Sequence, residues 1–198
     1  MALTVFQVAA DIENAQILET RTGERDLQKL FAPPANGEWV SGRPWPSHLT
    51  VFDQNAPRAN FFYLNDMFLV MDAQAEKACR VAFSSGELLQ FPAEGPGHVY
   101  LFNPLRRLDE HAVDWAATKG KYGAYHNLTL VGQHIPPPSI FRLPKMSGLY
   151  LSSELRDDGQ DFLYLYQKHK LSGLYFKRLW DEDSGPVPNR STQPGIDN

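Results

Sequence analysis

Short apolar runs separated by turn residues dominate the pattern along the chain, and most of them have the length of a β-strand. Leu3–Ala9 is rich in β-branched and aromatic residues, which predicts a first strand. Leu88–Phe91 and Val99–Phe102 predict a pair of strands joined by a loop that contains proline and glycine. Two further short strands are expected around Ile17-Leu18 and at Leu128–Val131. The pattern as a whole indicates a protein rich in sheet.

A helical spacing of apolar residues begins after Asp72, which is a plausible N-cap with Glu76 just inside the helix. The apolar positions that would form one face of this helix are Ala75, Cys79, Ala82 and Phe83. Gly86 is expected to end it. Cys79 is predicted to be a small buried side chain on that face.

One short phrase occurs twice near the C-terminus, as MSGLYL in Met146–Leu151 and as LSGLYF in Leu171–Phe176. Each copy is an apolar run entered through Ser-Gly, which suits a buried strand after a turn. The segment between them is long enough for a crossover helix, so the unit is a candidate strand–helix–strand. The helix is expected to start directly after the first strand or, if Gly159 breaks it, to run from about Asp161 to Lys170.

We therefore expect an α+β fold of mixed, mostly antiparallel sheets with a few packed helices and a C-terminal strand–helix–strand unit. One domain should span residues 1–180, and residues 181–198 read as an acidic, disordered tail. Prolines and glycines between Phe31 and Pro57 exclude a long helix there. Trp39 and Trp45 lie inside that stretch and either cover the edge of a core or form a binding surface.

The composition is that of a soluble globular protein, with 42% hydrophobic and 21% charged residues in 198. Residues 1–100 carry 12 acidic against 7 basic residues, a net charge of −5, whereas the remainder carries 11 against 12. An acidic N-terminal half disfavours nucleic acid and is compatible with a basic protein partner. A single cysteine, no signal-peptide pattern and no apolar run of membrane length predict a cytoplasmic protein without a membrane anchor.

No sequence motif for a nucleotide, a metal or a catalytic nucleophile occurs in the chain. The densest titratable group is Asp109, Glu110, His111 and Asp114, which would suit acid–base chemistry or, equally, a solvated turn. His126 and His134 flank one predicted strand, but a metal site would need further ligands from elsewhere. We expect no cofactor, no metal and no enzymatic activity.

Three segments occur in one order that is found in a known family. They are Asp72–Gly86 with Glu87–Pro92, Gly97–Leu105 with Leu108-Asp109, and Ile140–Pro144 (IFRLP) followed by the two Ser-Gly-Leu-Tyr phrases. In this order the chain resembles, over roughly residues 1–180, the eleventh numbered family of bacterial immunity proteins of polymorphic toxin systems, formerly a domain of unknown function. It departs from that family at Asp157-Asp158-Gly159, which interrupts the expected helix, and in its acidic tail.

The resemblance implies an immunity protein that binds a cognate antibacterial toxin, delivered by type VI secretion or another contact-dependent route, and covers its active site in the cytoplasm. From charge and exposure we expect acidic and aromatic side chains to contact that toxin. The predicted contact residues are Glu38, Trp39, Trp45, Asp53, Asp109, Glu110 and Asp114. Two alternatives remain: an adaptor or chaperone module for an effector, and an uncharacterised enzyme that uses the Asp109–His111 group.

Overall fold

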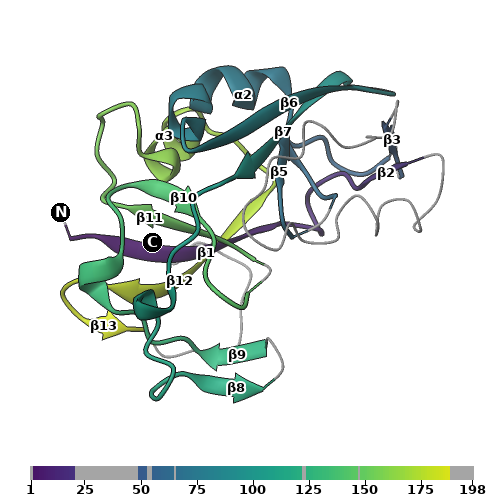
Figure 1. The fold of residues 1–198 in the computed structure, drawn as a ribbon. Coiled ribbons are helices and arrows are strands. Elements are labelled where there is room, and N and C mark those ends of the chain that lie inside the picture. The colour runs from purple at the N-terminus through teal and green to yellow at the C-terminus, as the bar shows by residue number, and fades with distance from the viewer. Residues whose placement is uncertain are drawn as a thin grey trace.

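The computed structural model describes residues 2–20, 49–52, 55–64, 66–121, 124–146 and 148–187. Over these ranges the protein has the expected α+β architecture, in which two large, mostly antiparallel sheets are packed with two short helices (Figure 1). The helices are α2 (Ala73–Cys79), which continues as the 3₁₀ turn η1 (Arg80–Phe83), and α3 (Phe162–Lys168). Among the described residues, no helix is long and apolar enough to cross a membrane.

The first sheet has five strands in the order β10-β11-β1-β12-β13. Their bounds are β10 Ser139–Phe141, β11 Leu149–Ser153, β1 Thr4–Ala10, β12 Leu174–Asp181 and β13 Gly185–Pro186. The N-terminal strand β1 lies at the centre and pairs antiparallel with both β11 and β12. These two flanking strands are therefore parallel to each other, with β1 between them. The predicted strand–helix–strand unit is confirmed, and its two strands are separated by a strand from the other end of the chain.

The second sheet has six strands in the order β2-β3-β6-β7-β5-β4. Their bounds are β2 Leu18–Thr20, β3 Leu49–Val51, β6 Gly86–Ala93, β7 Gly97–Pro104, β5 Leu69–Met71 and β4 Phe61–Phe62. Its two ends meet, because Leu18 N–H donates to Tyr63 O at 2.8 Å and Tyr63 N–H to Gln16 O at 3.0 Å. The sheet is thus closed on itself like a small barrel. A separate hairpin contains β8 (Lys119–Lys121) and β9 (Ala124–Asn127).

Three apolar clusters alternate with the two sheets. One fills the six-stranded sheet with side chains such as Val70, Phe91 and Leu101. The largest lies between the two sheets and includes Met71 and Leu151, together with the buried faces of both helices. The third covers the opposite face of the five-stranded sheet around Val5. Because both sheets bury residues on both faces, strands such as β5 and β11 are buried at every residue.

The first predicted helix begins at its predicted cap, Asp72, and the second begins after Asp161, which is also its cap. The carboxylate of Asp72 accepts a hydrogen bond from Ala75 N–H at 2.8 Å, and that of Asp161 accepts one from Tyr164 N–H at 3.2 Å. Gly159 precedes α3 with a φ of +75°, so the helix begins after the break at this glycine rather than directly after β11. Phe162 and Leu163 are buried in the central cluster, and Tyr166 packs beside them.

Two expectations are wrong. Leu128–Val131 is not a strand: Leu128 and Leu130 are buried beneath the five-stranded sheet, and only an isolated bridge joins Leu130 to Val113. The apolar spacing there reflects burial rather than strand pairing. The tail also does not begin at Asp181, because that residue is buried at the end of β12 and pairs with Gly185 of β13. Residues 188–198 lie outside the described part of the chain.

Candidate interaction surface

The acidic group predicted from the sequence forms an exposed turn that holds its own carboxylates in place. Asp109 caps the 3₁₀ turn η2 (Glu110–Ala112), with Oδ1 accepting from His111 N–H at 2.8 Å. Asp114 Oδ1 accepts from the amides of Ala116 and Ala117, both at 3.0 Å. We call Asp109–Asp114 the acidic turn. Its two aspartates are fixed by backbone hydrogen bonds while their residues stay exposed to solvent.

The acidic turn rests on a buried base. Ala112 and Val113, between the two aspartates, are almost completely buried. Val131 N–H donates to Ala112 O at 3.0 Å, and Asp114 N–H donates to Thr129 O at 2.9 Å. The backbone of the turn is therefore tied to the neighbouring segment, and the exposed carboxylates sit on a rigid support.

A lysine from another segment approaches the turn. Lys145 Nζ lies 3.2 Å from Glu110 Oε2 and 4.9 Å from the centre of the Trp115 ring. Both side chains of the ion pair are more than half exposed, so the pair contributes little to stability. Its consequence is local: Glu110 has a positive neighbour, whereas Asp109 and Asp114 are held by amides.

A histidine of the acidic turn lies close to a second histidine from a neighbouring segment. The rings of His111 and His134 are 6.1 Å apart between centroids, and Gln133 Nε2 lies 3.1 Å from His134 Nε2. The side chain of His126 lies outside the described residues, so its predicted position beside His134 is not tested. Within the described ranges, no three His, Cys, Asp or Glu side chains are grouped so that they could hold a metal ion.

Four of the predicted contact residues, Glu38, Trp39, Trp45 and Asp53, lie outside the described residues. The residue before Asp53 was missed: Phe52 is 66% exposed at the end of β3, where its N–H donates to Ile17 O at 2.8 Å. Alternation could have identified it, since Leu49 and Val51 pack into the interior of the six-stranded sheet and Phe52 has the opposite parity. An exposed aromatic of this size is a candidate anchor for a partner.

Two polar side chains away from the acidic turn, Cys79 and Arg142, are buried in the interior. Burial raises the pKa of the Cys79 thiol to about 12, so it is not a thiolate at neutral pH. Arg142 is buried where the two sheets meet and donates to Met67 O at 2.6 Å, Pro104 O at 3.2 Å and Asn103 Oδ1 at 3.0 Å. Burial, together with the charge of Arg107, lowers the Arg142 pKa to about 10, which leaves the guanidinium positive at neutral pH.

Comparison with known proteins adds no assignment to this geometry. No protein-family model matches the chain, and no curated protein is significantly similar to it.

Proposed function

We propose that this chain is an immunity protein, which binds a cognate antibacterial toxin in the cytoplasm and covers its active site. Two things support the proposal: the resemblance of its ordered segments to the immunity family, and an exposed acidic surface whose shape is fixed before any partner arrives. The family resemblance supplies the class of partner, and the surface supplies a means of contact.

The observation that carries the proposal is the acidic turn. Asp109 and Asp114 are exposed, yet each accepts backbone hydrogen bonds at 2.8–3.0 Å and sits beside buried Ala112 and Val113. Carboxylates that are already ordered lose little conformational entropy when they bind. An anionic, pre-formed surface is complementary to the basic cleft of an enzyme that acts on a negatively charged substrate. We therefore place such a toxin's active-site cleft opposite the acidic turn.

The direct test is protection. The chain is co-expressed in bacteria with the protein encoded immediately upstream of it, and growth is compared with that of cells that express the upstream protein alone. Restored growth together with a stoichiometric complex on size exclusion is expected. A complex without protection would support the adaptor alternative instead. If the two proteins do not bind and growth is not restored, the proposal is refuted.

The surface is tested by charge reversal in the same assays. Glu110→Lys reverses a charge on the acidic turn and adds repulsion with Lys145, so association with a basic toxin should slow several-fold and lose much of its salt dependence. Glu13→Lys makes the same change at an exposed site on the turn after β1 and serves as the matched control. Equal association rates for the two variants would show that the acidic turn is not in the interface.

The enzyme alternative has its own discriminating result. Asp109→Ala removes the carboxylate of the Asp109–His111 group. Catalysis would be favoured if the wild type turns over a substrate and this variant does not, while circular dichroism shows that the variant is folded. Under the immunity proposal the same variant alters binding to the toxin, and the free protein has no turnover to lose.

A further inference from the structure

The outer edge of β12 has backbone groups that no strand in the described part of the chain uses. Asp11 N–H donates to Gly173 O at 3.0 Å, which places Gly173 in a hydrogen-bonded pair with the chain of β1. Hydrogen-bonding direction alternates along an antiparallel strand, so Tyr175 and Lys177 also bond to β1. Leu174, Phe176 and Arg178 then direct their N–H and C=O groups away from β1. The hydroxyl of Tyr166 confirms this direction, because it lies 3.2 Å from Leu174 N and 3.4 Å from Leu174 O.

Two other ends of the large sheets have backbone partners in the described part of the chain. At the β10 end of the five-stranded sheet, the segment Arg106–Leu108 pairs with Arg142, which follows β10. Arg142 N–H donates to Arg106 O and Leu108 N–H donates to Arg142 O, both at 2.9 Å. The six-stranded sheet is joined end to end through Ile17 and Tyr63. On the outer side of β12, β13 pairs with Trp180 and Asp181, and Val187 N–H after it donates to Leu179 O at 2.9 Å.

Among the described residues, a short open window is therefore left between Tyr166 of α3 and Val187. In the described part of the chain, the outward N–H and C=O groups of Phe176 and Arg178 have no backbone partner. An exposed strand edge of this kind is a template for one more strand. The window admits only a few residues, which suits an extended segment rather than a whole sheet.

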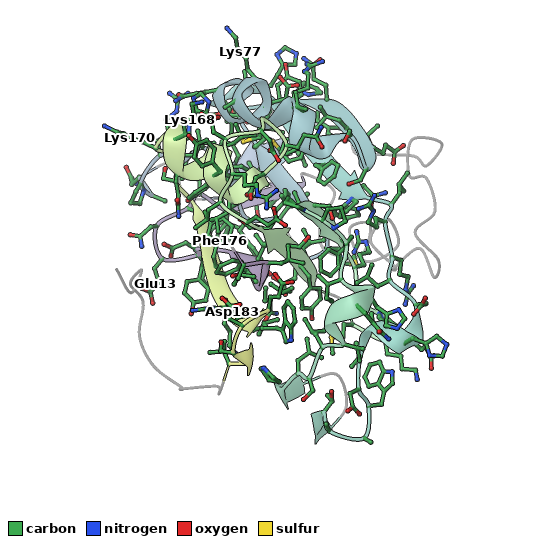
Figure 2. All side chains as sticks on the ribbon, turned by 90° about the vertical axis from the view of Figure 1, so that its left-hand side faces the viewer. Glu13, Lys77, Lys168, Lys170, Phe176 and Asp183 are labelled. Carbon is green, nitrogen blue, oxygen red and sulfur yellow. The ribbon has the colours of Figure 1, made fainter. Side chains whose placement is uncertain are left out.

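The side chains around the window are unevenly charged. Figure 2 shows Phe176 in the middle of this side of the molecule, Lys168 and Lys170 toward α3, and Asp183 at the opposite end. Lys177 lies on the strand itself, next to Phe176 in sequence. Of these lysines, Lys168 pairs with Asp157 at 3.0 Å. The α3 end of the window is thus the basic end and is complementary to acidic side chains.

We propose that the edge at Phe176–Arg178 binds a short extended segment with acidic side chains from a partner protein, which adds as a strand beside β12. This inference rests on the proposed function, so the partner is the toxin. The segment would be a second contact with the toxin, separate from the acidic turn. A second copy of this chain fits less well. Its own β13 already covers part of the outer side of its β12, so two β12 edges could pair over only a few residues.

The test uses a synthetic probe and does not depend on the toxin. A short capped peptide of alternating valine and glutamate is titrated into the ¹⁵N-labelled full chain, with a valine–lysine peptide as the charge control. Amide exchange should slow at Phe176 and Arg178 only with the glutamate peptide. The amides of Tyr175 and Lys177 should exchange slowly throughout, because they already bond to β1, and they provide an internal reference.

A backbone variant separates strand addition from side-chain contact. Phe176→Pro removes an outward N–H, which an edge strand tolerates, whereas Phe176→Leu keeps it. Relative to Phe176→Leu, the proline variant should bind the peptide at least about tenfold more weakly, which corresponds to the loss of roughly one hydrogen bond. Equal affinities of the two variants would overturn the proposal.

The remaining outcomes are also decisive. In the wild type, shifts confined to residues outside β12, or no shifts at all, would reject the edge as a binding site. Concentration-dependent shifts at Phe176 without peptide would identify a second copy as the occupant and reject the acidic segment. If the peptide binds as expected but the upstream protein is neither bound nor neutralised, the edge stands and the immunity proposal fails.

Discussion

The two copies of Ser-Gly-Leu-Tyr have nearly the same sequence and different surroundings. In β11 all five residues are buried, with Leu149 and Leu151 in the cluster between the sheets and Tyr150 in the cluster on the other face. In β12 the corresponding tyrosine, Tyr175, is 42% exposed. The shared phrase therefore specifies a strand after a turn, and the position of the strand in the sheet determines how much of it is buried.

The difference arises from neighbours that are distant in sequence. β11 has β10 on one side and β1 on the other, whereas β12 has β1 on one side and only the short β13 on the other. The residues that follow each phrase agree with this arrangement, since Ser152-Ser153 continue β11 and Lys177-Arg178 continue β12. Charged side chains on an edge strand also discourage unwanted pairing. The copy in β12 is thus suited to a surface that selects its partner.

The largest contrast is expected between the two tyrosines. Tyr150→Ala should lower the free energy of unfolding by about 4 kcal/mol, because a buried aromatic is lost. Its ring stacks on Phe141 at 6.3 Å between centroids, and its hydroxyl lies 3.0 Å from Met146 Sδ. Tyr175→Ala should cost about 1 kcal/mol or less. Urea unfolding of both variants measures the difference, and equal losses would refute the contrast between the strands.

For the glycines of the two phrases the ranking should be reversed, so that substitution of the glycine before β12 costs more stability than substitution of the glycine before β11. Gly173 has a φ of +98°, and a Cβ there would lie 2.4 Å from Phe61 O, so Gly173→Ala should cost about 3 kcal/mol. Gly148 has no positive φ, and a Cβ would come no nearer than 3.4 Å to Gln7 Nε2. Gly148→Ala should therefore change stability by less than about 1 kcal/mol. Thermal melts of the two variants, followed by circular dichroism, test this ranking.

A smaller effect is expected at the connection that follows β11. Asp161 is fully buried and accepts hydrogen bonds from Ser153 Oγ at 2.8 Å, Glu154 N–H at 2.8 Å and Tyr164 N–H at 3.2 Å. Asp161→Ala removes the cap of α3 and leaves these donors without an acceptor, so it should cost about 2 kcal/mol. Asp72→Ala removes the cap of α2 and the acceptor that lies 3.1 Å from the Asn60 amide nitrogen, and about 1 kcal/mol is expected. Denaturant midpoints that rank the two in reverse would contradict this account.

Local features of this chain were predictable from its sequence. Asp72 was recognisable as a cap because capping depends on a few neighbouring residues, and α2 begins after it. The start of α3 near Asp161 was expected from the break at Gly159, whereas the capping role of Asp161 was not identified. The exposed turn at Asp109 and Asp114 has the same origin, since short acidic side chains bond to nearby amides. The strand at Leu128–Val131 was wrongly predicted because burial under a sheet produces the same apolar spacing as pairing within one.

Features that depend on distant pairing were not predictable. Nothing near Leu174–Arg178 shows that β1, from the other end of the chain, lies beside it and leaves its far side open. The guanidinium of Arg142 likewise meets Met67, Asn103 and Pro104 only after both sheets have formed. The phrase in β12 was expected to be core throughout, and the exposed ring of Tyr175 shows that this holds only for β11.

The last contrast is electrostatic, because β11 ends in neutral serines and β12 ends in Asp181. Burial by itself raises the pKa of this carboxyl, but hydrogen bonds from Arg178, Thr4 and the amide of Asp183 outweigh it and hold the pKa below its ordinary 3.8. A carboxyl with a lowered pKa binds its proton more weakly in the folded than in the unfolded state. Its contribution to stability is therefore complete above the unfolded pKa and is lost as the pH falls through the folded one.

Urea unfolding between about pH 3 and pH 6 measures this contribution. The wild type should lose stability across the acidic end of that window, and Asp181→Asn should be less stable at pH 6 and depend less on pH. Asp183→Asn changes a neighbouring exposed carboxyl and should follow the wild-type curve. A wild-type curve that matches that of Asp181→Asn throughout would mean that the buried end of β12 does not depend on its charge, and that the two strands differ in packing alone.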